Sequence, residues 1–228
     1  MRIFLDTETT GKEKDDRLIQ VAYKYGSATV NELFKPPKKI EIEAMAVHHI
    51  TEKMVSNQPT FKDSPTSKEL ATLLETNILI AHNASFDVEM LKREGIEANK
   101  IICTRKVASA LDVSGVIPSY ALQYLRYFLD LDIEGMAHDA LGDVLVLEKL
   151  FDRLSLKMSE EKMLEVSSQP MLIRQFRFGK YNGKSIEEVS KTDSNYLRWL
   201  LEQKSMKPEG EEDWIFTLHY YLNRANED

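Results

Sequence analysis

The sequence has little cysteine and no long apolar run, and both shortages restrict what the protein can be. Cys103 is the single cysteine among 228 residues, so an intramolecular disulfide is excluded and a reducing compartment is expected. No apolar run approaches the roughly 20 residues that a membrane-spanning helix needs. Met1 leads directly into a strand pattern in place of a signal peptide. We therefore predict a cytoplasmic protein with no membrane partner.

Positive charge is also scarce. The chain has 30 Lys and Arg against 37 Asp and Glu, a net charge of −7. Proteins that bind nucleic acid without sequence preference are usually basic, because neutralised phosphates supply much of their affinity. The acidity therefore argues against tight, undirected binding of nucleic acid, unless cations held by some of the acids invert the local field.

Residues 174–184 depart from this acidity. They hold four Lys or Arg and no Asp or Glu, and three aromatic residues are interleaved with the cations. Cations beside aromatic rings suit a strand of nucleic acid, through phosphate contacts and base stacking. The same pattern also fits an ordinary hairpin with its rings inward and its cations outward, and the sequence leaves the two interpretations open.

The first chemical motif is a pair of carboxylates, Asp6 and Glu8, at the end of the apolar run that begins at Ile3. Residues i and i+2 of a strand project from one face, so this pair points one way and Thr7 the other. Two neighbouring acids beside a hydrophobic strand resist desolvation unless a cation joins them. Taken by itself, the pair fits a metal site or a strand that ends at a solvated turn.

Further acids follow in two other segments. Asp87 lies just inside a helix pattern after the apolar run 78–81, and Asp143 lies near the beginning of an amphipathic helix pattern. Four carboxylates from three segments suit two Mg²⁺ ions, with Mn²⁺ able to substitute, because both ions prefer oxygen ligands. His138 precedes Asp143 by five residues, about 140° away around a helix, so we expect it on the loop or first turn ahead. A histidine there can accept a proton from an attacking water.

These segments resemble the three motifs of the DnaQ-like, DEDDh superfamily of exonucleases. The matching segments are Asp-Thr-Glu at 6–8, Asn-Ala-Ser-Phe-Asp at 83–87, and His138 with Asp143. The histidine five residues before the last aspartate is typical of the DEDDh branch. Four more segments are similar to the bacterial exodeoxyribonuclease X family, namely 44–55, 102–104, 178–184 and 196–200. The resemblance therefore extends over nearly the whole chain.

The resemblance implies a 3′–5′ exonuclease that hydrolyses DNA with two metal ions, releases 5′-mononucleotides and serves DNA repair or recombination. It implies that Asp6, Glu8, Asp87 and Asp143 are the metal ligands and that His138 is the general base. It also implies substrate contacts by Thr9, Thr10, Gly11, Val47, His48, Asn83 and Phe86. The residues themselves leave alternatives open, since Asn83 fits a helix cap and Phe86 a core position.

The loop 12–16 departs from what some relatives need. It is entirely charged, whereas an apolar side chain at this place could wedge between the bases of a duplex end. The sequence therefore puts strong activity on blunt duplex DNA in doubt. We expect single-stranded or frayed 3′ ends as the preferred substrate and leave duplex ends open as a further one.

The order of the elements predicts an α/β fold. Residues 3–6, 18–25 and 29–34 fit successive hairpin strands, and helix patterns then alternate with strands at 78–81 and 100–103. Three antiparallel strands followed by parallel strands, flanked by helices, are the arrangement of the ribonuclease H-like fold that the resemblance implies. We expect an exonuclease core at 1–155, a linker helix and loop at 156–170, and a small C-terminal domain of a hairpin and helices at 171–228.

Other functions remain open on the sequence. A proofreading exonuclease like the ε subunit of DNA polymerase III, or an oligoribonuclease, would use the same chemistry. The sequence does not reveal whether DNA or RNA is preferred, because a single backbone contact can sense a 2′-hydroxyl. A module that binds nucleic acid without cutting it is a different class, and the presence of all four acids and the histidine counts against it.

Overall fold

A computed structural model of the protein describes residues 1–131, 133 and 140–224. The chain divides into two compact units. One comprises Met1–Val107 with Ser119–Ser167, and the other comprises Ala108–Pro118 with Ser168–Asp228. The acids predicted for the site all belong to the first unit.

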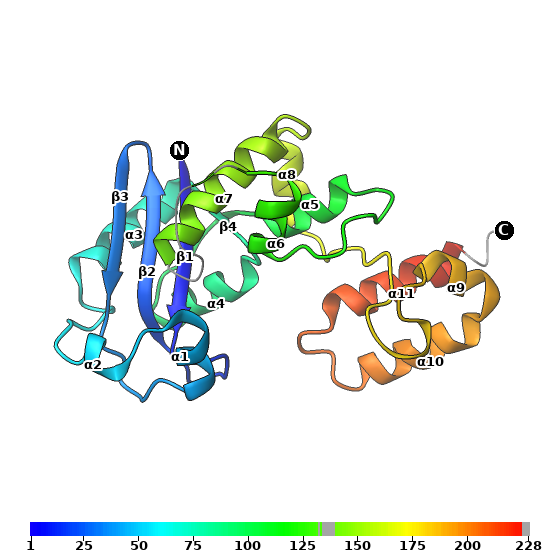
Figure 1. The fold of residues 1–228 in the computed structure, drawn as a ribbon, viewed down its shortest axis with the longest axis horizontal. Helices are drawn as coiled ribbons and strands as arrows, with labels where there is room; N and C mark the ends of the chain where they lie inside the picture. The colour runs from blue at the N-terminus through cyan, green and yellow to red at the C-terminus, as the bar shows by residue number, and fades with distance from the viewer. Residues whose placement is uncertain (132, 134–139, 225–228) are drawn as a thin grey trace. The chain divides into compact units, whose positions relative to one another are not determined.

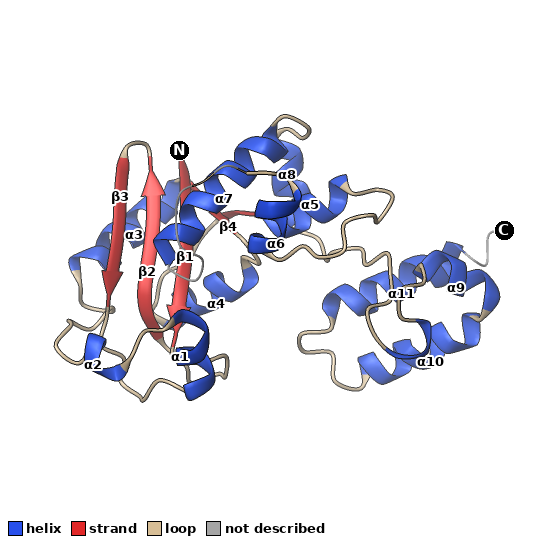
Figure 2. Cartoon of the chain, in the orientation of Figure 1, coloured by secondary structure: helices blue, strands red, loops and turns tan. Residues whose placement is uncertain are grey.

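The first unit is built on a mixed sheet, which has five strands among the described residues and the order β3-β2-β1-β4-β5 (Figures 1 and 2). β1, β2 and β3 pair antiparallel, and β4 and β5 join them parallel to β1. The predicted order of antiparallel strands followed by parallel strands is confirmed. The strands are β1 (Arg2–Thr9), β2 (Leu18–Tyr25), β3 (Ala28–Leu33), β4 (Ile78–Ala81) and β5 (Lys100–Cys103).

Helices flank both faces of this sheet. Figure 1 shows α7 on the near face and α3 behind the strands. The side chain of Ser64 caps α3 by accepting a hydrogen bond from Ser67 N (3.0 Å), and Pro65 opens the helix, both common at helix starts. The described helices up to residue 167 are α1 (Ile42–His48), α2 (Glu52–Val55), α3 (Pro65–Thr76), α4 (Ser85–Arg93), α5 (Thr104–Leu111), α6 (Leu122–Phe128), α7 (Ala140–Ser155) and α8 (Glu160–Ser167). All belong to the first unit except α5, whose second half belongs to the other unit.

The side chains of β1 alternate between these two helix layers. Ile3 and Leu5 are fully buried in a core cluster that includes residues of α3 and α4. Phe4 points to the other face, where its ring lies 5.5 Å from the ring of Phe151 on α7. Because side chains of a strand alternate, every later residue of β1 is assigned a face by this packing. The core thus decides which helices the acids of β1 can meet.

The second unit is a small helical body with its own core. Its helices are α9 (Ile186–Thr192), α10 (Ser194–Ser205) and α11 (Glu212–Arg224). Phe176, Val189, Leu197 and Leu218 are fully buried among them. The described part of the chain includes no helix that is long and apolar enough to cross a membrane.

The predicted hairpin of this unit is reduced to one antiparallel bridge, between Gln175 and Ser185. The bridge closes a loop that contains a 3₁₀ turn, η1 (Gly179–Tyr181). Gly179 and Gly183 adopt left-handed φ values of 67° and 84°, which glycine tolerates without strain. The chain reverses at these two glycines within a few residues, which leaves too little extended backbone for longer strands.

Candidate active site

Asp6 and Glu8 lie near the end of β1 and are half-buried. They follow Phe4 by two and four residues, so both carboxylates project toward the layer of α7, while Thr7 projects toward α4. The pairing of β1 with β2 changes register between Glu8 and Thr9. Such irregularities re-aim side chains and are common beside active sites.

Asp87 reaches β1 from the opposite layer. It lies in the first turn of α4, where its side chain is 3% exposed, and the hydroxyl of Thr7 donates a hydrogen bond to its Oδ1 (2.8 Å). Burial raises the pKa of Asp87 to about 7, although the Thr7 hydroxyl and nearby backbone N–H groups favour the charged form. A buried carboxylate of this kind is stabilised by a nearby cation. Through its hydrogen bond with Thr7, Asp87 lies next to the residue that stands between Asp6 and Glu8 in β1.

Asp143 lies in the first turn of α7, which packs on β1 and β2. It is half-buried, and Nε2 of Gln123 on α6 donates a hydrogen bond to its Oδ1. The predicted acids thus lie on β1 and on two helices that contact it, α4 and α7. No group of three or more His, Cys, Asp or Glu among the described residues converges as metal ligands do. Carboxylates without a cation repel one another, and their oxygen donors are of the kind that Mg²⁺ and Mn²⁺ bind.

His138, the predicted general base, belongs to the segment 134–139, which lies outside the described residues. Its position five residues before Asp143 is therefore known from the sequence only. The role assigned to it stays a prediction.

The segment Thr9–Gly11 forms a tightly bonded turn after β1. Thr9 Oγ1 donates to the carbonyl of Gly11 (2.6 Å), and Thr10 Oγ1 donates to Asp16 Oδ1 (2.6 Å). A Cβ at Gly11 would lie 2.5 Å from Glu41 Oε2 and 2.6 Å from Asp16 Oδ2, so a side chain here requires its neighbours to move. The predicted substrate segment is therefore rigid and has a glycine where space is lacking.

Asp16 anchors this turn. It is fully buried at the end of the charged loop 12–16, where it forms an ion pair with Lys38 (2.7 Å) and accepts a hydrogen bond from Glu13 N (2.6 Å). Burial by itself would raise the pKa of Asp16, but the bonds from Lys38, Thr10 and Glu13 and the charge of Lys38 hold it below its usual range. The sequence pattern did not distinguish this buried acid from its four exposed neighbours.

Val47 and His48 end α1, next to this turn. Val47 is 50% exposed, whereas His48 is buried. His48 Nδ1 accepts a hydrogen bond from Ile50 N (2.9 Å), so in the neutral ring Nε2 carries the proton. Within the described structure Nε2 is buried and makes no hydrogen bond of good geometry, while the Thr9 backbone, which approaches the ring, acts to raise its pKa. Burial lowers that pKa, so the histidine is held as a neutral donor.

Asn83 and Phe86 lie where β4 passes into α4. Asn83 adopts a left-handed φ of 63°, and its Oδ1 accepts a hydrogen bond from Nη1 of Arg105 on α5 (2.8 Å). No side chain caps the N-terminus of α4, so Asn83 does not have the capping role that the sequence left open. Phe86 is partly buried and packs against the main core.

Arg105 and Gln123 are the residues near the site that sequence reasoning missed. Each contacts a predicted site residue from another helix, Arg105 on Asn83 and Gln123 on Asp143. Neither belongs to a motif, and both are ordinary polar residues of helix patterns. No local signal could have identified them, because each contact depends on how separate segments pack.

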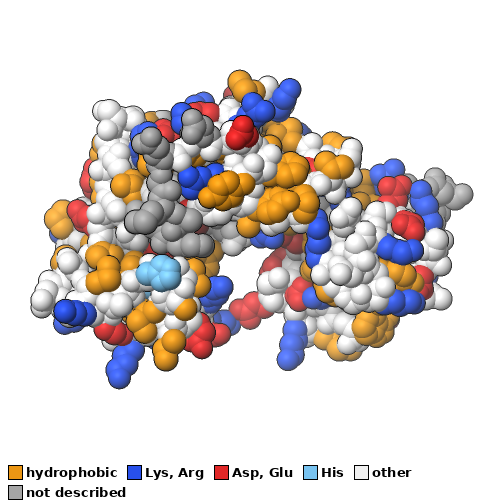
Figure 3. All heavy atoms as spheres, viewed as in Figure 1, with side chains coloured by type: hydrophobic (Ala, Val, Ile, Leu, Met, Phe, Trp, Pro, Cys, Tyr) orange, Lys and Arg blue, Asp and Glu red, His pale blue; other side chains and the backbone are white. Residues whose placement is uncertain are grey.

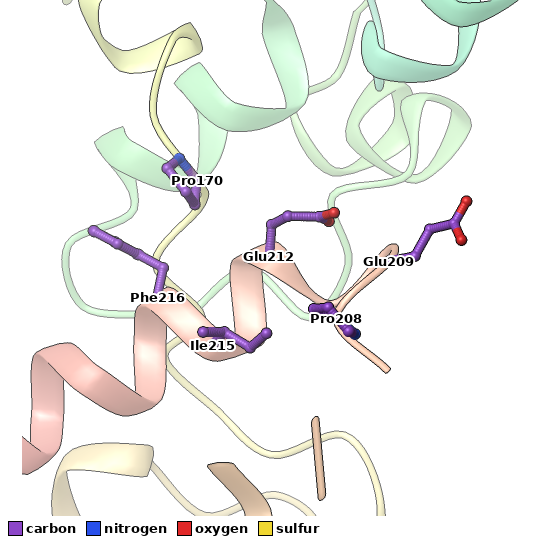
Figure 4. Close-up of a pocket in the computed structure, with 6 residues that line it drawn as sticks. All are labelled: Pro170, Pro208, Glu209, Glu212, Ile215 and Phe216. Atoms are coloured by element: carbon purple, nitrogen blue, oxygen red, sulfur yellow. The ribbon is translucent and has the colours of Figure 1, made fainter. Parts of the chain in front are cut away.

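Outside the predicted motifs, the described residues offer a surface of mixed charge and a pocket. In Figure 3, Lys and Arg side chains are interspersed with Asp and Glu over the visible face. One pocket of about 560 Å³ lies in the second unit (Figure 4). Pro208 and Glu209 line it from the loop before α11, Glu212, Ile215 and Phe216 from α11 itself, and Pro170 completes it. None of these six residues belongs to a predicted motif.

Comparison with known proteins finds likeness over nearly the whole chain. Residues 3–151 match the family model described as Exonuclease, and residues 176–205 match the one described as Exodeoxyribonuclease X-like C-terminal. Exodeoxyribonuclease 10 of Escherichia coli (strain K12) is 32% identical over 228 residues, which cover 97% of this chain and 98% of that protein.

Solved structures share the fold of this chain. An exonuclease X in complex with 5′-overhanging duplex DNA is 27% identical, with a TM-score of 0.62 over 73% of this chain and 99% of that chain. E. coli exonuclease I in complex with a dA16 oligonucleotide, 19% identical with a TM-score of 0.57 over 72% of this chain and 42% of that one, shares the fold. The expected ribonuclease H-like fold is confirmed. The chain therefore belongs to the exonuclease family and is a DnaQ-like 3′–5′ exonuclease.

Proposed function

We propose that the protein is an exodeoxyribonuclease that removes 5′-mononucleotides from single-stranded or frayed 3′ ends of DNA, with two Mg²⁺ ions. The observation that carries this proposal is the position of Asp87, hydrogen-bonded to Thr7 between Asp6 and Glu8. The near full-length likeness to an exodeoxyribonuclease supports DNA as the substrate. The likeness to an exonuclease in complex with 5′-overhanging duplex DNA adds duplex ends to the substrates to be tested.

Asp6, Glu8, Asp87 and Asp143 are the residues that would hold the ions. Exonucleases of this family depend on divalent metal ions, and carboxylate oxygens are the ligands that Mg²⁺ prefers. Bound ions of this kind lower the pKa of an attacking water and stabilise the leaving 3′ oxygen. In the proposal His138 accepts the proton of that water.

His48 contributes to binding the 3′ nucleotide. Its Nε2–H is buried and makes no hydrogen bond of good geometry in the described structure, and a buried donor of this kind favours a ligand that offers an acceptor. A sugar or base oxygen of the substrate would supply the acceptor. Exposed Val47 gives the same nucleotide an apolar contact, and the rigid turn Thr9–Gly11 keeps its backbone in place beside them. Asn83, held by Arg105, and Phe86 remain proposed contacts for the next nucleotide.

Two observations favour an exodeoxyribonuclease over the alternatives. The match to the exodeoxyribonuclease X-like C-terminal family covers residues 176–205, beyond the catalytic segment. The likeness to exodeoxyribonuclease 10 also covers both units. An oligoribonuclease is distinguished by the substrate test below, whereas a proofreading subunit would give the same DNA ladder and is disfavoured by the two likenesses above. A role in DNA repair or recombination and a cytoplasmic location stay predictions.

The test is degradation of 5′-labelled single-stranded DNA, with a matching RNA and blunt or frayed duplexes alongside. The wild-type protein is assayed with Mg²⁺, with Mn²⁺ and with EDTA, beside His138→Ala and the control His219→Ala, which changes an exposed histidine of α11. We expect a ladder that shortens from the 3′ end, is abolished by EDTA and by His138→Ala, and persists in His219→Ala. DNA that stays intact both with Mg²⁺ and with Mn²⁺ would overturn the proposal. Faster degradation of RNA than of DNA would favour an oligoribonuclease.

A further inference from the structure

The second unit contains a continuous network of aromatic rings centred on Phe176. Phe176 is fully buried, and its ring centroid lies 5.7 Å from Trp214, 5.9 Å from Tyr181, 5.9 Å from Tyr196 and 6.3 Å from Phe178. These contacts belong to the core of the unit. Packing of the core therefore explains the inner rings.

Core packing does not explain the two ends of the network. Phe178 is 40% exposed, and Trp199 is 51% exposed. Trp199 extends the network outward on α10, with its ring 5.5 Å from that of Tyr196. Burying a tryptophan is among the largest apolar gains available to a fold. Two large rings left on the surface of so small a unit are therefore available to a ligand.

Two lysines lie over rings of this network. Lys180 Nζ lies 4.7 Å from the ring of Tyr181 and 5.9 Å from that of Tyr196, and Lys204 Nζ lies 5.7 Å from that of Phe178. Each lysine also pairs with one acid, Lys180 with Asp193 (3.0 Å) and Lys204 with Glu211 (2.6 Å). The side chain of Lys180 is 64% exposed, so its ion pair is weak and it can exchange Asp193 for a phosphate. Lys204 is half-buried, and its contact with the ring of Phe178 places a cation beside that exposed ring.

Two arginines add charge that their recorded bonds do not neutralise. Arg198 is the neighbour of Trp199 and donates to Ser194 Oγ and Asn195 Oδ1 (3.0 and 3.3 Å), and Arg177 donates to the carbonyl of Ile117 (3.1 Å). All these acceptors are neutral. Within a chain of net charge −7, residues 174–184 carry four Lys or Arg and no acid. The charge complements an anionic ligand.

We propose that Phe178 and Trp199, with Lys180, Arg198 and Lys204, form an aromatic-basic surface that binds a single strand of nucleic acid. Bases stack on the exposed rings and the cations contact the phosphates, the combination by which proteins hold single strands without reading their sequence. This inference rests on the proposed function, because it assigns the second unit a contact with the same substrate.

We expect the surface of the second unit to affect KM and the acids of the first unit to determine kcat. Two contacts on one strand raise the effective concentration of the strand at each of them. The aromatic-basic surface therefore lowers KM for long strands and leaves kcat on dinucleotides unchanged, because a dinucleotide is too short to need it.

The two tryptophans of the chain, Trp199 and Trp214, provide a direct test. In Trp214→Phe the fluorescence comes from Trp199 alone, and we expect an oligothymidylate of about 20 nucleotides, longer than the roughly 4–16 that single-strand modules cover, to quench it in EDTA. Fluorescence anisotropy of labelled oligothymidylate should show about 10-fold weaker binding by Trp199→Ala. Trp199→Tyr keeps a ring and should restore much of the affinity.

The control is Leu156→Ala, which removes a 74% exposed side chain of the first unit and should bind like wild type. Unquenched Trp199 together with wild-type affinity in Trp199→Ala would overturn the proposal and leave the surface as a protein contact. Loss of dinucleotide turnover in Trp199→Ala would likewise overturn it in favour of a structural role. Binding without degradation would contradict the proposed function and leave this inference standing.

Discussion

Single residues differ in how far the protein removes their charges from water. Asp6, Glu8 and Asp143 are half-buried, whereas Asp87 is almost fully buried and depends on Thr7 for its hydrogen bond. A carboxylate in that position lowers the stability of the fold until a cation approaches it. In the proposed function, an ion bound beside Asp87 would offset this loss of stability.

Substitution of Asp87 by asparagine separates these two effects. The amide would keep an acceptor for the Thr7 hydroxyl and remove the buried charge, so Asp87→Asn should be at least as stable as wild type in EDTA. We expect activity to fall by orders of magnitude, because ligands of one site act as a unit. Thermal unfolding with and without Mg²⁺ checks this, since an ion at about 100 times its Kd adds about 2.7 kcal/mol to wild type. Equal stabilisation of the variant by Mg²⁺ would contradict the assignment of Asp87 as a ligand.

His82 gives the protein a pH-dependent stability. Its Nε2 donates to the carbonyl of Tyr120 (2.7 Å) and its Nδ1 bonds to Thr104 Oγ1 (2.9 Å). Burial lowers the pKa of His82 to about 4, although the bond to Tyr120 favours the protonated ring. The unfolded chain takes up the proton near pH 6.5, so this contribution is complete above that pH and is lost as the pH falls toward 4.

The expected loss is up to about 3 kcal/mol of unfolding free energy between about pH 7 and pH 4. Urea unfolding over that range measures it in wild type and in His82→Gln, whose amide can still donate to Tyr120. The slope should be shallower in His82→Gln and unchanged in His219→Gln, which alters an exposed histidine. Equal slopes in all three proteins would show that His82 is not the group responsible.

At the scale of elements, the turn after β1 depends on one ion pair inside the charged loop. Lys38 contacts both Asp15 (3.1 Å) and Asp16 (2.7 Å), but Asp15 is 77% exposed and Asp16 is fully buried. Exposed pairs contribute little because water screens them, whereas breaking a buried pair leaves polar groups unpaired. The two neighbouring acids therefore form a matched comparison.

Asp16→Ala should lower the unfolding free energy by about 3 kcal/mol and loosen the turn Thr9–Gly11. Asp15→Asn should leave stability almost unchanged. Denaturant unfolding measures the first effect, and we expect KM for single-stranded DNA to rise in Asp16→Ala more than kcat falls. A similar stability in both variants would mean that Asp16 does not anchor the turn.

At the scale of the whole molecule, the two units have separate cores. Residues of the sheet and of α3 and α4 make up a core cluster in the first, and Phe176, Leu197 and Leu218 belong to the core of the second. Each core buries side chains of its own unit. Local destabilisation of one unit therefore need not reach the other.

Leu197→Ala tests this independence, because it removes a fully buried side chain from the second core. We expect a cost of about 2–5 kcal/mol to the second unit. Hydrogen exchange should show lost protection in α9, α10 and α11 but not in β1 and β2. Dinucleotide hydrolysis should persist, and its loss together with protection in β1 would show that the chain unfolds as one body.

The sequence by itself determined the local part of this protein. The limits of β2, β4 and β5 match the predicted ranges 18–25, 78–81 and 100–103, because an apolar run and its flanking breakers are local features. The shared face of Asp6 and Glu8 follows from strand alternation. The exonuclease family followed from motifs within single segments, and the comparisons confirm it.

Tertiary structure decided what depends on packing between distant segments. β1 runs on to Thr9 because β2 pairs with it past the acids, where the polar pattern suggested an end. The docking of Asp87 on Thr7, the burial of Asp16 and the contact of Gln123 with Asp143 join residues far apart or hidden in charged loops. The chemistry of each side chain is written in the sequence, but its burial and its partners exist only once the segments pack together.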